Sequence, residues 1–413
     1  MIISSSRTHA SKMKAIKFWY CLVIRGKMVR PTILTTCIII IFNIGGIYIV
    51  SRFREPIDIV IPVKWTDTDD VNRYSLETGT KSKVILFWTK YYGSPSWLVK
   101  AGKEKCGRYT CFLTYNKSHY DKASALVFHH RTDWLLRLPT DRPRIPWQRW
   151  VLYNRESSWW GPKGAELSKA NDLINWTMGL RGDNDITIPT AKIWKGQFKE
   201  GFDPYKNYLE GKTGKVVALM SDCMYHPLPT GYKSRKKYLE FLTKHGLKID
   251  MYGKCGKSCG ETFSSCAETL KKFKFVLAFE NSICDEYISE KPYRNGLQLG
   301  VVPVVMSGAN LSDPYVLPPG SFIDAGQFSS VTTLVAFLEK VGSDPQLYKK
   351  YFEWRKDWNF QLISENEGFE QFSDDYYCPL CTKLHENHPP KSIRNLQNWY
   401  EQEKCRPFPS MKP

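Results

Sequence analysis

The feature that most constrains this chain is an uncharged, strongly apolar run from Thr32 to Val50. As a helix, the run would span roughly 28 Å, close to the hydrocarbon thickness of an early secretory membrane. Basic residues precede it, and the first acidic residue of the chain is Glu55. The positive-inside rule then places residues 1–31 in the cytosol and the chain after the run in the lumen or outside the cell. We therefore predict a transmembrane signal anchor over 32–50.

The run also has two other interpretations. A cleaved signal peptide is disfavoured by the long basic lead and by the lack of a small-x-small cleavage site after the run. A buried core helix is the second alternative.

Length and composition allow two domains beyond the run. The chain has 413 residues, of which 42% are apolar, so it can build cores of ordinary size. Its net charge of +18 would suit nucleic acid, but no zinc finger, RNP-like sequence or basic helix supports that partner. An anionic small ligand or an acidic glycoconjugate fits the charge at least as well.

Most of the cysteines follow the apolar run and would therefore face an oxidising compartment. An even number there favours disulfides over zinc ligands or a redox dithiol, although the pairing does not follow from the sequence. Three N-x-S/T sequons, at Asn116, Asn175 and Asn310, also fit the secretory route. The ten cysteines are Cys106, Cys111, Cys223, Cys255, Cys259, Cys266, Cys284, Cys378, Cys381 and Cys405.

Two α/β regions follow a polar stretch, 51–80, which indicates a short stem. Apolar runs rich in β-formers predict four strands in the first region. The second region begins near residue 215 and alternates apolar strands with helical patterns, which favours a parallel, doubly wound sheet. No GxGxxG sequence indicates a dinucleotide. The predicted strands are 83–88, 108–115, 124–130, 149–154, 215–223, 248–253, 274–279, 301–305 and 321–325; the predicted helices are 234–246, 267–273, 289–299 and 328–342.

The stretch from Phe279 to Val305 places many charged side chains between two apparently buried strands. In doubly wound sheets, ligands bind beyond the carboxyl ends of strands, where helix N-termini point. Ser289 is a candidate N-cap of helix 289–299. Lys291 would lie in the first turn, where a cation is unfavourable unless an anion binds there. A solvated loop with a Glu–Lys pair is the alternative.

This stretch, "FVLAFENSICDEYISEKPYRNGLQLGVVPVV", resembles the signature of the α1,3-fucosyltransferases. "RPRIPWQRWVLYNRESS" and "LINWTMGLRGDNDITIP" resemble two earlier segments of that family. "YFEWRKDW" and "CPLCTKLHENHPPKSIRNLQNWY" resemble its C-terminal end. The resemblance covers roughly 83–405, with the motifs in the family's order.

The resemblance implies transfer of L-fucose from GDP-β-L-fucose to the 3-hydroxyl of GlcNAc, with inversion. Such a displacement needs a base for the acceptor hydroxyl and positive charge for the departing GDP. Glu156 matches the family glutamate and is the predicted base, although Ser158 stands where the family has proline. Lys291 matches the phosphate-binding lysine. Since Glu156 lies in the first region, the two regions must face each other.

Further donor-binding residues are implied by the same motifs. Glu290 would accept hydrogen bonds from the ribose hydroxyls, while Tyr287 and Asn281 would line the nucleotide or fucose pocket. Arg235 would be the second phosphate-binding cation.

The match for Arg235 is looser than the others. Asp222 replaces the family asparagine, and "MYHPLPTGYK" intervenes before Arg235. Lys236 or Lys237 could therefore serve instead.

No metal is expected to be obligatory, because basic residues replace it in a two-Rossmann enzyme; a divalent metal would be stimulatory at most. GDP-fucose is a substrate, not a cofactor. The acidic groups at 67–70 and 183–185 resemble a metal-binding D-x-D, but the first lies in the stem. The second follows Arg181 in an Arg-Gly-Asp triplet, yet its family match disfavours adhesion. His129 and His130 either border the acceptor cleft or are structural.

We therefore predict an α/β fold with two Rossmann-like domains, the GT-B type, behind the anchor and stem. The expected divisions are an acceptor-side domain over 81–205, a GDP-fucose-binding domain over 206–360, and a cysteine-containing segment over 361–413 that packs back on the catalytic region. The expected location is the Golgi membrane, type II, with the catalytic part lumenal.

The expected partners are GDP-fucose, an N-glycan acceptor with GlcNAc, and the membrane; nucleic acid is not expected, and a homodimer is possible. The sequence does not distinguish a core from an antennary GlcNAc. Two alternative functions are a lumenal glycan-binding protein without turnover and a thiol–disulfide exchanger built on Cys378 and Cys381.

Overall fold

The computed structural model describes most of the chain after residue 81 and the backbone of three earlier strands. The described residues are 17–22, 36–43, 46–51, 82–94, 97, 99–130, 134–162, 165–196, 201–206, 208–221, 223, 235–260, 263–363, 376–406 and 408. They belong to two compact units, Met1–Asp67 and Thr68–Pro413. Nearly all of the predicted stem, including the acidic group at 67–70, and also Asp222, lie outside the described residues.

The first unit contains strands where a helix was predicted. Antiparallel strands β1 (Lys17–Leu22), β2 (Thr36–Asn43) and β3 (Gly46–Ser51) form one sheet. Over Thr36–Asn43 and Gly46–Ser51, the structure therefore shows strands in place of the helix predicted over 32–50. Isoleucine dominates the run, and β-branched residues suit a strand better than a helix. Over the described part of the chain, none of the helices combines the length and apolarity required to cross a bilayer.

The first α/β region forms a seven-stranded sheet with the order β10-β9-β8-β7-β4-β6-β5. Its neighbours are parallel except for the edge strand β5. The four predicted strands are confirmed as β4, β6, β7 and β8. Strand β5 ("GKEKC") was missed because charged residues, common on edge strands, obscure its pattern. The bounds are β4 Lys83–Phe87, β5 Gly102–Cys106, β6 Tyr109–Thr114, β7 Ala125–His129, β8 Arg149–Asn154, β9 Trp176–Gly179 and β10 Ile186–Thr187.

The second α/β region forms a five-stranded sheet with the order β13-β12-β14-β16-β17, in which all neighbours are parallel. This is the predicted doubly wound arrangement. Its central strands are almost wholly buried, which explains their continuous apolar sequences. The bounds are β12 Gly214–Leu219, β13 Ile249–Tyr252, β14 Phe273–Phe279, β16 Val302–Met306 and β17 Ile323–Asp324.

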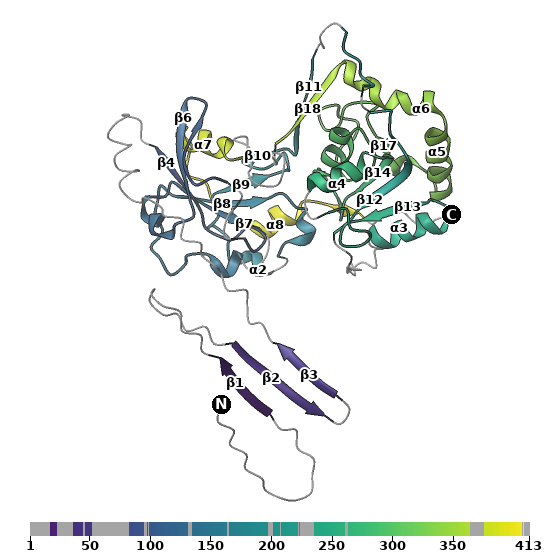
Figure 1. Cartoon of the computed structure of the whole chain (residues 1–413). Coiled ribbons are helices and arrows are strands. Elements are labelled where there is room, and N and C mark those ends of the chain that lie inside the picture. Colours follow the sequence, from purple (N-terminus) through teal and green to yellow (C-terminus); the bar gives the residue numbers. More distant parts are fainter. Residues whose placement is uncertain are drawn as a thin grey trace, which may run out of the picture. The chain divides into compact units, whose positions relative to one another are not determined.

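Helices cover both faces of each sheet (Figure 1). On the second sheet, α3 and α5 share one core with the strands, and α4 shares the opposite core. On the first sheet, α7 lies in one core, and α2 and α8 contribute to the other. The bounds are α2 Ala165–Ser168, α3 Arg235–Lys244, α4 Phe263–Leu270, α5 Val331–Ser343, α6 Pro345–Lys349, α7 Cys378–His385 and α8 Leu396–Glu401.

One predicted helix is replaced by another geometry. The α-helix expected over 289–299 is a π-helix, Lys291–Gly296, followed by a short 3₁₀ segment, Leu297–Leu299. Ser289 is not its N-cap, because its backbone N–H and its hydroxyl both bond to Glu280. Pro292 lacks an N–H and restrains the residue before it, which is consistent with the altered helix start.

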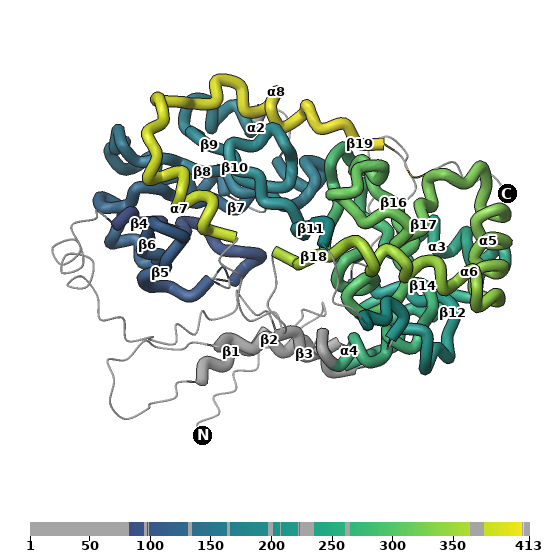
Figure 2. Tube along the Cα trace, turned by 90° about the horizontal axis from the view of Figure 1, so that it is seen from above, coloured from purple at the N-terminus to yellow at the C-terminus, as the bar shows by residue number. Residues whose placement is uncertain are grey.

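Two features join the regions. Strand β11 (Ala191–Lys195), which leaves the first region, pairs with β18 (Trp358–Leu362), which leaves the second. The C-terminal segment then returns to the first sheet: α7 contacts β4, β5 and β6, and α8 contacts α2 (Figure 2). Finally, β19 (Cys405–Arg406) pairs with β15 (Ile283–Cys284) of the second region. The C-terminal segment therefore connects both regions.

All ten cysteines after the apolar run are paired, as the oxidising environment predicted. Cys378 and Cys381 bond to β5 and β6, not to each other, so the thiol–disulfide exchanger interpretation is wrong. The remaining pairs lie at the carboxyl edge of the second sheet or tie β15 to β19. The pairs are Cys106–Cys378, Cys111–Cys381, Cys223–Cys255, Cys259–Cys266 and Cys284–Cys405.

Candidate active site

The second sheet brings two predicted cations to its topological switch point. Its strand order reverses between β12 and β14, and crevices at such points bind ligands. Arg235 opens α3 and donates from Nη1 to the carbonyl of Phe279, the last residue of β14, at 3.1 Å. Its positive charge also acts on Lys291, where it partly opposes the rise in pKa that Glu280 and Glu290 cause. The two basic side chains therefore converge on one end of β14.

Lys291 is held by a buried acid that was not assigned from the sequence. Its Nζ lies 2.7 Å from Glu280 Oε2 and 2.6 Å from Ser289 Oγ. The Glu280 side chain is fully buried and that of Lys291 is 18% exposed. Burial by itself would lower the pKa of Lys291, but the charges of Glu280 and Glu290 outweigh it and raise the pKa. Lys291 is therefore a fixed cation.

Glu290 occupies the next position in this network. Its Oε1 lies 3.4 Å from Arg294 Nη2. Burial by itself would raise the pKa of Glu290, but the positive charges of Lys291 and Arg294 lower it to about 2. Glu290 is therefore ionised at neutral pH and can only accept hydrogen bonds, as its predicted contact with ribose hydroxyls requires.

Glu156 extends from the first sheet toward the second. Asn154 ends β8, and its side chain accepts from the Glu156 N–H at 2.8 Å in an Asx-type turn. Glu156 Oε2 accepts from Tyr287 Oη at 2.9 Å and from Asn281 Nδ2 at 3.2 Å. Its Oε1 accepts from Tyr92 Oη at 2.9 Å. The structure thus joins the predicted base to two predicted donor-binding residues.

The loop after β14 docks on the first region along most of its length. Ser282 Oγ lies 2.6 Å from Ser157 Oγ, and both side chains are buried. Thr190 Oγ1 donates to the carbonyl of Ile288 at 2.8 Å. The N–H of Gly182 donates to Glu286, and the N–H of Asp285 donates to the carbonyl of Lys404, just before β19. The motif stretch is therefore also the contact between the two sheets.

Ser158 shows why this chain departs from the family's proline. The N–H of Ser158 donates to Glu403 Oε2 at 2.6 Å, and a proline has no N–H to donate. Glu403 is buried, and burial raises its pKa, with a partial offset from this hydrogen bond. The substitution thus ties the Glu156 loop to the C-terminal segment.

Arg155 was not identified from the sequence. It lies between the two regions: its Nη2 contacts Thr190 Oγ1 at 3.3 Å, and its charge helps to lower the pKa of Glu290. Its buried Nε has no hydrogen-bond partner in the described structure. Burial alone would lower the pKa of Arg155, but the hydroxyls of Tyr153 and Tyr376 raise it. The only sequence signal that could have suggested it is the position of an arginine directly before Glu156.

The carboxyl edge of the first sheet is lined with aromatic rings. The rings of Tyr91, Tyr92 and Trp97 lie 4.7 to 5.5 Å from that of His129, centroid to centroid. His130 is buried, and its Nδ1 lies 2.8 Å from Tyr400 Oη in α8. His129 therefore belongs to the edge near Glu156, whereas His130 supports the C-terminal segment.

The Arg-Gly-Asp triplet is occupied by internal contacts. Arg181 forms an ion pair with Asp183 and donates to the Trp399 carbonyl at 3.2 Å. Asp185 accepts from Lys391, and from the Thr177 N–H at 3.0 Å. These acids hold the chain in place and are not gathered around a common metal position.

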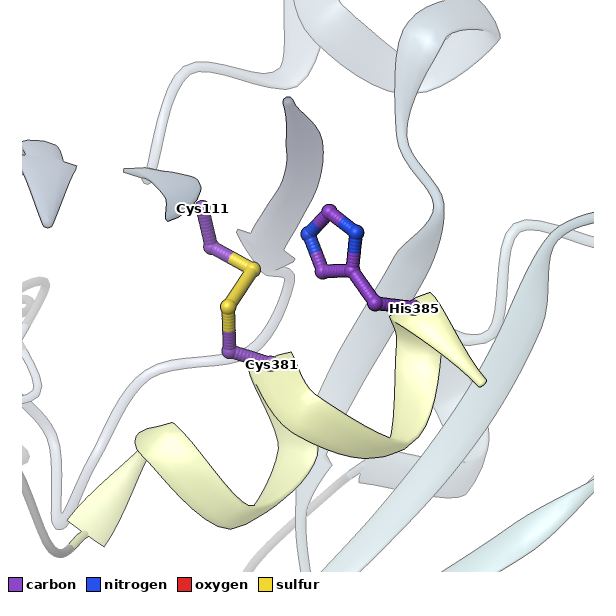
Figure 3. Close-up of side chains that lie close together, drawn as sticks. All are labelled: Cys111, Cys381 and His385. Atoms are coloured by element: carbon purple, nitrogen blue, oxygen red, sulfur yellow. A yellow bond between two sulfur atoms is a disulfide. The ribbon is translucent and has the colours of Figure 1, made fainter. Parts of the chain in front are cut away.

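One cluster has metal-ligand chemistry but is a disulfide. Cys111, Cys381 and His385 lie together at α7, and a sulfur–sulfur bond joins the two cysteines (Figure 3). His385 Nε2 lies 3.0 Å from the Thr110 carbonyl, and its ring stacks on Tyr109 at 4.6 Å. Both sulfurs are consumed by the bond, so the residues do not fit a metal centre.

The three sequons differ in accessibility. Asn116 and Asn310 are exposed. Asn175 is only 8% exposed, and its Nδ2, the atom that a glycan would modify, donates to the Lys391 carbonyl at 2.8 Å. Its Oδ1 accepts from the Trp150 N–H at 2.7 Å. Burial and these hydrogen bonds disfavour a glycan at Asn175 in the folded chain.

Comparison with known proteins identifies the family. The model "Fucosyltransferase, N-terminal" matches residues 80–191, and "Glycosyltransferase family 10 (fucosyltransferase) C-term" matches residues 209–399. A human 4-galactosyl-N-acetylglucosaminide 3-alpha-L-fucosyltransferase FUT6 is 32% identical over 338 residues, covering 80% of this chain and 87% of that protein. The chain belongs to glycosyltransferase family 10, the fucosyltransferases. The resemblance seen in the motifs is therefore confirmed.

Two other matches span a smaller share of this fucosyltransferase. A human alpha-(1,3)-fucosyltransferase 4 is 30% identical over 329 residues, and the match spans 70% of this chain but only 58% of that protein. The crystal structure of an alpha1,3-fucosyltransferase with GDP-fucose also matches. The superposition spans 75% of this chain and 92% of the other protein's chain, at 13% sequence identity and a TM-score of 0.44. The two family matches correspond to the two sheets, and they contain Glu156 and Lys291 respectively.

Proposed function

We propose that this chain is an inverting α1,3-fucosyltransferase of the GT-B type, which moves L-fucose from GDP-β-L-fucose to the 3-hydroxyl of a GlcNAc unit. The observation that carries the proposal is the convergence of Glu156 from one sheet with Asn281 and Tyr287 from the other. The same loop continues to the cation Lys291. A base and a phosphate-binding cation are the two groups that a single inverting displacement needs.

In this mechanism, the acceptor oxygen forms a bond to C1 of fucose as the bond from C1 to the GDP oxygen breaks. The proton of the acceptor hydroxyl passes to Glu156. Lys291 and Arg235 stabilise the negative charge that develops on the diphosphate. Because these cations already lie at the carboxyl edge of β14, no obligatory metal is required to neutralise GDP, and a divalent metal would be stimulatory at most.

The nucleotide would bind beside Lys291 at the switch point of the second sheet. Glu290 is ionised and would accept hydrogen bonds from the ribose hydroxyls. Asn281 and Tyr287 each donate one hydrogen bond to Glu156. We therefore expect both side chains to contact the fucose of the donor where it lies next to the base.

For the acceptor, we propose an N-glycan with a GlcNAc unit. The name of the human relative specifies a 4-galactosyl-N-acetylglucosaminide, which is an antennary unit. The C-terminal "YYCPLCTKLHE" instead resembles core-directed members of the family slightly more than antennary ones, which does not decide the acceptor. The two acceptors therefore have to be compared directly.

We also propose that the chain acts in the lumen of the Golgi, attached to the membrane through the apolar run Thr32–Val50. The five disulfides support an oxidising compartment. Extraction of cell membranes with alkaline carbonate tests the attachment: the chain should remain in the membrane pellet, and its release into the supernatant would contradict it.

The decisive experiment incubates the purified full-length chain with GDP-fucose and each of two acceptors, a core chitobiose glycopeptide and N-acetyllactosamine. We expect α1,3-linked fucose on at least one of them, with one GDP released per fucose transferred. Binding of a glycan without transfer to either acceptor would favour the glycan-binding alternative and reject the enzyme.

A further inference from the structure

The two oxygens of the Glu156 carboxylate have different surroundings. Oε2 receives hydrogen bonds from Tyr287 and Asn281. Tyr287 is 3% exposed and lies in the loop that docks between the sheets, so this oxygen is held from the interior. Two donors occupy the two lone-pair directions of Oε2. A substrate hydroxyl therefore has to approach Oε1.

Oε1 is covered by Tyr92. The Tyr92 hydroxyl donates to Oε1 at 2.9 Å, although half of the tyrosine surface, 50%, is exposed. Its ring packs edge-on against Tyr91 and His129, each at 4.8 Å. Tyr92 therefore lies on the solvent side of the base, whereas Tyr287 lies on the interior side.

The turn that carries Tyr92 is built for this orientation. Tyr91 and Ser94 exchange backbone hydrogen bonds at 2.9 Å across a two-residue turn. Tyr92 has φ 47° and Gly93 has φ 88°. Both residues are thus in the left-handed region, where glycine and asparagine are common but an aromatic residue is unusual. A tyrosine at this position points to a use for its side chain rather than to a preference of the turn.

Resting on the fucosyl transfer proposed above, we propose that Tyr92 is a positioning residue that caps Glu156 Oε1 until the acceptor arrives. The acceptor hydroxyl then displaces the Tyr92 hydroxyl and takes its place on Oε1, the oxygen that receives the proton. The Tyr92 ring remains as a wall of the acceptor site.

The cap has a chemical consequence in the absence of an acceptor. Water that reached Oε1 could attack C1 of GDP-fucose: its oxygen would bond to C1, the bond from C1 to GDP would break, and its proton would pass to Glu156. The products would be free fucose and GDP. Tyr92 occupies the position that this water needs, so it limits wasteful hydrolysis of the donor.

The test is Tyr92→Phe, which removes only the hydroxyl, in the purified full-length chain. We expect GDP release without acceptor to rise roughly five- to tenfold and the KM for acceptor to fall roughly threefold, since one hydrogen bond to a charged group is lost. The dissociation constant of GDP should stay unchanged. The acceptor is whichever of the core chitobiose glycopeptide and N-acetyllactosamine the unmodified chain uses.

Two further variants complete the design. Tyr92→Leu also removes the ring and should raise the KM for acceptor, the opposite of Tyr92→Phe; a purely structural tyrosine would not separate the two. Tyr315→Phe alters a tyrosine that is 61% exposed on the second region and should leave every value unchanged.

Unchanged hydrolysis in Tyr92→Phe, or a raised KM for acceptor, would overturn the inference while the unmodified chain still transfers fucose. If the unmodified chain transfers no fucose, the proposed function itself fails. Failure of the Tyr92 inference and failure of the proposed function are therefore distinguished by the activity of the unmodified chain.

Discussion

The carboxylates at the edges of the two sheets have opposite environments. Glu156, on the first sheet, is surrounded by neutral donors, namely two tyrosine hydroxyls and one amide. Glu280 and Glu290, on the second sheet, lie against cations. Neutral hydroxyl contacts can be exchanged for a substrate hydroxyl at little cost, whereas a buried ion pair cannot be broken cheaply.

This difference separates the two chemical tasks. A carboxylate with exchangeable partners can accept a proton from an incoming hydroxyl. Carboxylates fixed against Lys291 and Arg294 instead hold positive charge in place for a phosphate. In the proposed mechanism, the same residue type would thus serve as a base on one sheet and as a cation anchor on the other.

The largest effect is expected at the base. Glu156→Gln keeps the hydrogen-bonding shape but removes the proton acceptor, so kcat should fall about 10³-fold, within the range for general-base catalysis. The dissociation constant of GDP, measured by calorimetry, should change less than about twofold, because no phosphate contact is altered. Glu166→Gln, at an exposed position in α2, is the control. Retained turnover in Glu156→Gln would remove Glu156 from this role.

The next effect is expected at the cation. Lys291→Ala should weaken GDP binding roughly 30- to 100-fold, the value of a charged hydrogen bond, and should lower the free energy of unfolding by about 3 kcal/mol because Glu280 is left buried and unpaired. Calorimetry and urea unfolding measure the two quantities.

The double variant Lys291→Ala/Glu280→Gln separates these consequences. Removing the orphaned charge should recover much of the stability but none of the GDP affinity. GDP affinity that is unchanged in the single variant would contradict the phosphate assignment.

A smaller effect is expected when the loop between the sheets is released. Replacing Cys284 and Cys405 by serine removes a disulfide between positions 121 residues apart, which should lower the free energy of unfolding by about 2–4 kcal/mol. The KM for acceptor should also rise, because the loop that holds Glu156 is tied through this bond. Replacement of Cys259 and Cys266, seven residues apart, is the control and should leave the KM unchanged. A KM for acceptor that is unchanged in both variants would show that the Cys284–Cys405 disulfide does not position the base.

The smallest effect concerns pH. The folded-state pKa of Glu290 is about 2, below its ordinary value of 4.5, so its ionised form stabilises the fold above pH 4.5. This contribution is lost as the pH falls from about 4.5 to about 2. The Glu290 side chain is 30% exposed, so solvent screening limits the contribution to about 1 kcal/mol.

Glu290→Gln lacks this contribution. Urea unfolding at several pH values should therefore show the unmodified chain losing its advantage over the variant within that window. A constant difference between pH 5 and pH 2 would contradict the ion-pair assignment.

The sequence was most informative where strands are buried on both faces. Strands β14 and β16 read as continuous apolar runs, so both were predicted within one or two residues. Strand β5 was missed because only local pattern is visible in a sequence and its edge position is not. The helix over 289–299 was mispredicted because the Ser289 N–H donates to Glu280, at the end of β14, and this tertiary contact is not visible in the local sequence.

The candidate site residues also divide into those visible in the local sequence pattern and those that only the tertiary structure reveals. Glu156 and Lys291 were identified because their motif spacing is local. Glu280, Arg155 and Tyr92 were not, because the role of each depends on a contact that forms only when the chain folds. Asn175 shows the converse: its triplet satisfies the sequon, but burial uses its amide for hydrogen bonds.

By itself, the sequence determined the family, the two α/β regions and the oxidised state of the cysteines, and it supplied the predicted base and its candidate cations. These depend on residue type, periodicity and short spacing, which are properties of the chain alone. Only the tertiary structure decided which cysteines pair, which acid holds Lys291, and that the loop after β14 is also the contact between the sheets. Those outcomes depend on how the chain folds back on itself, over 11 residues between Glu280 and Lys291 and over 131 residues between Glu156 and Tyr287.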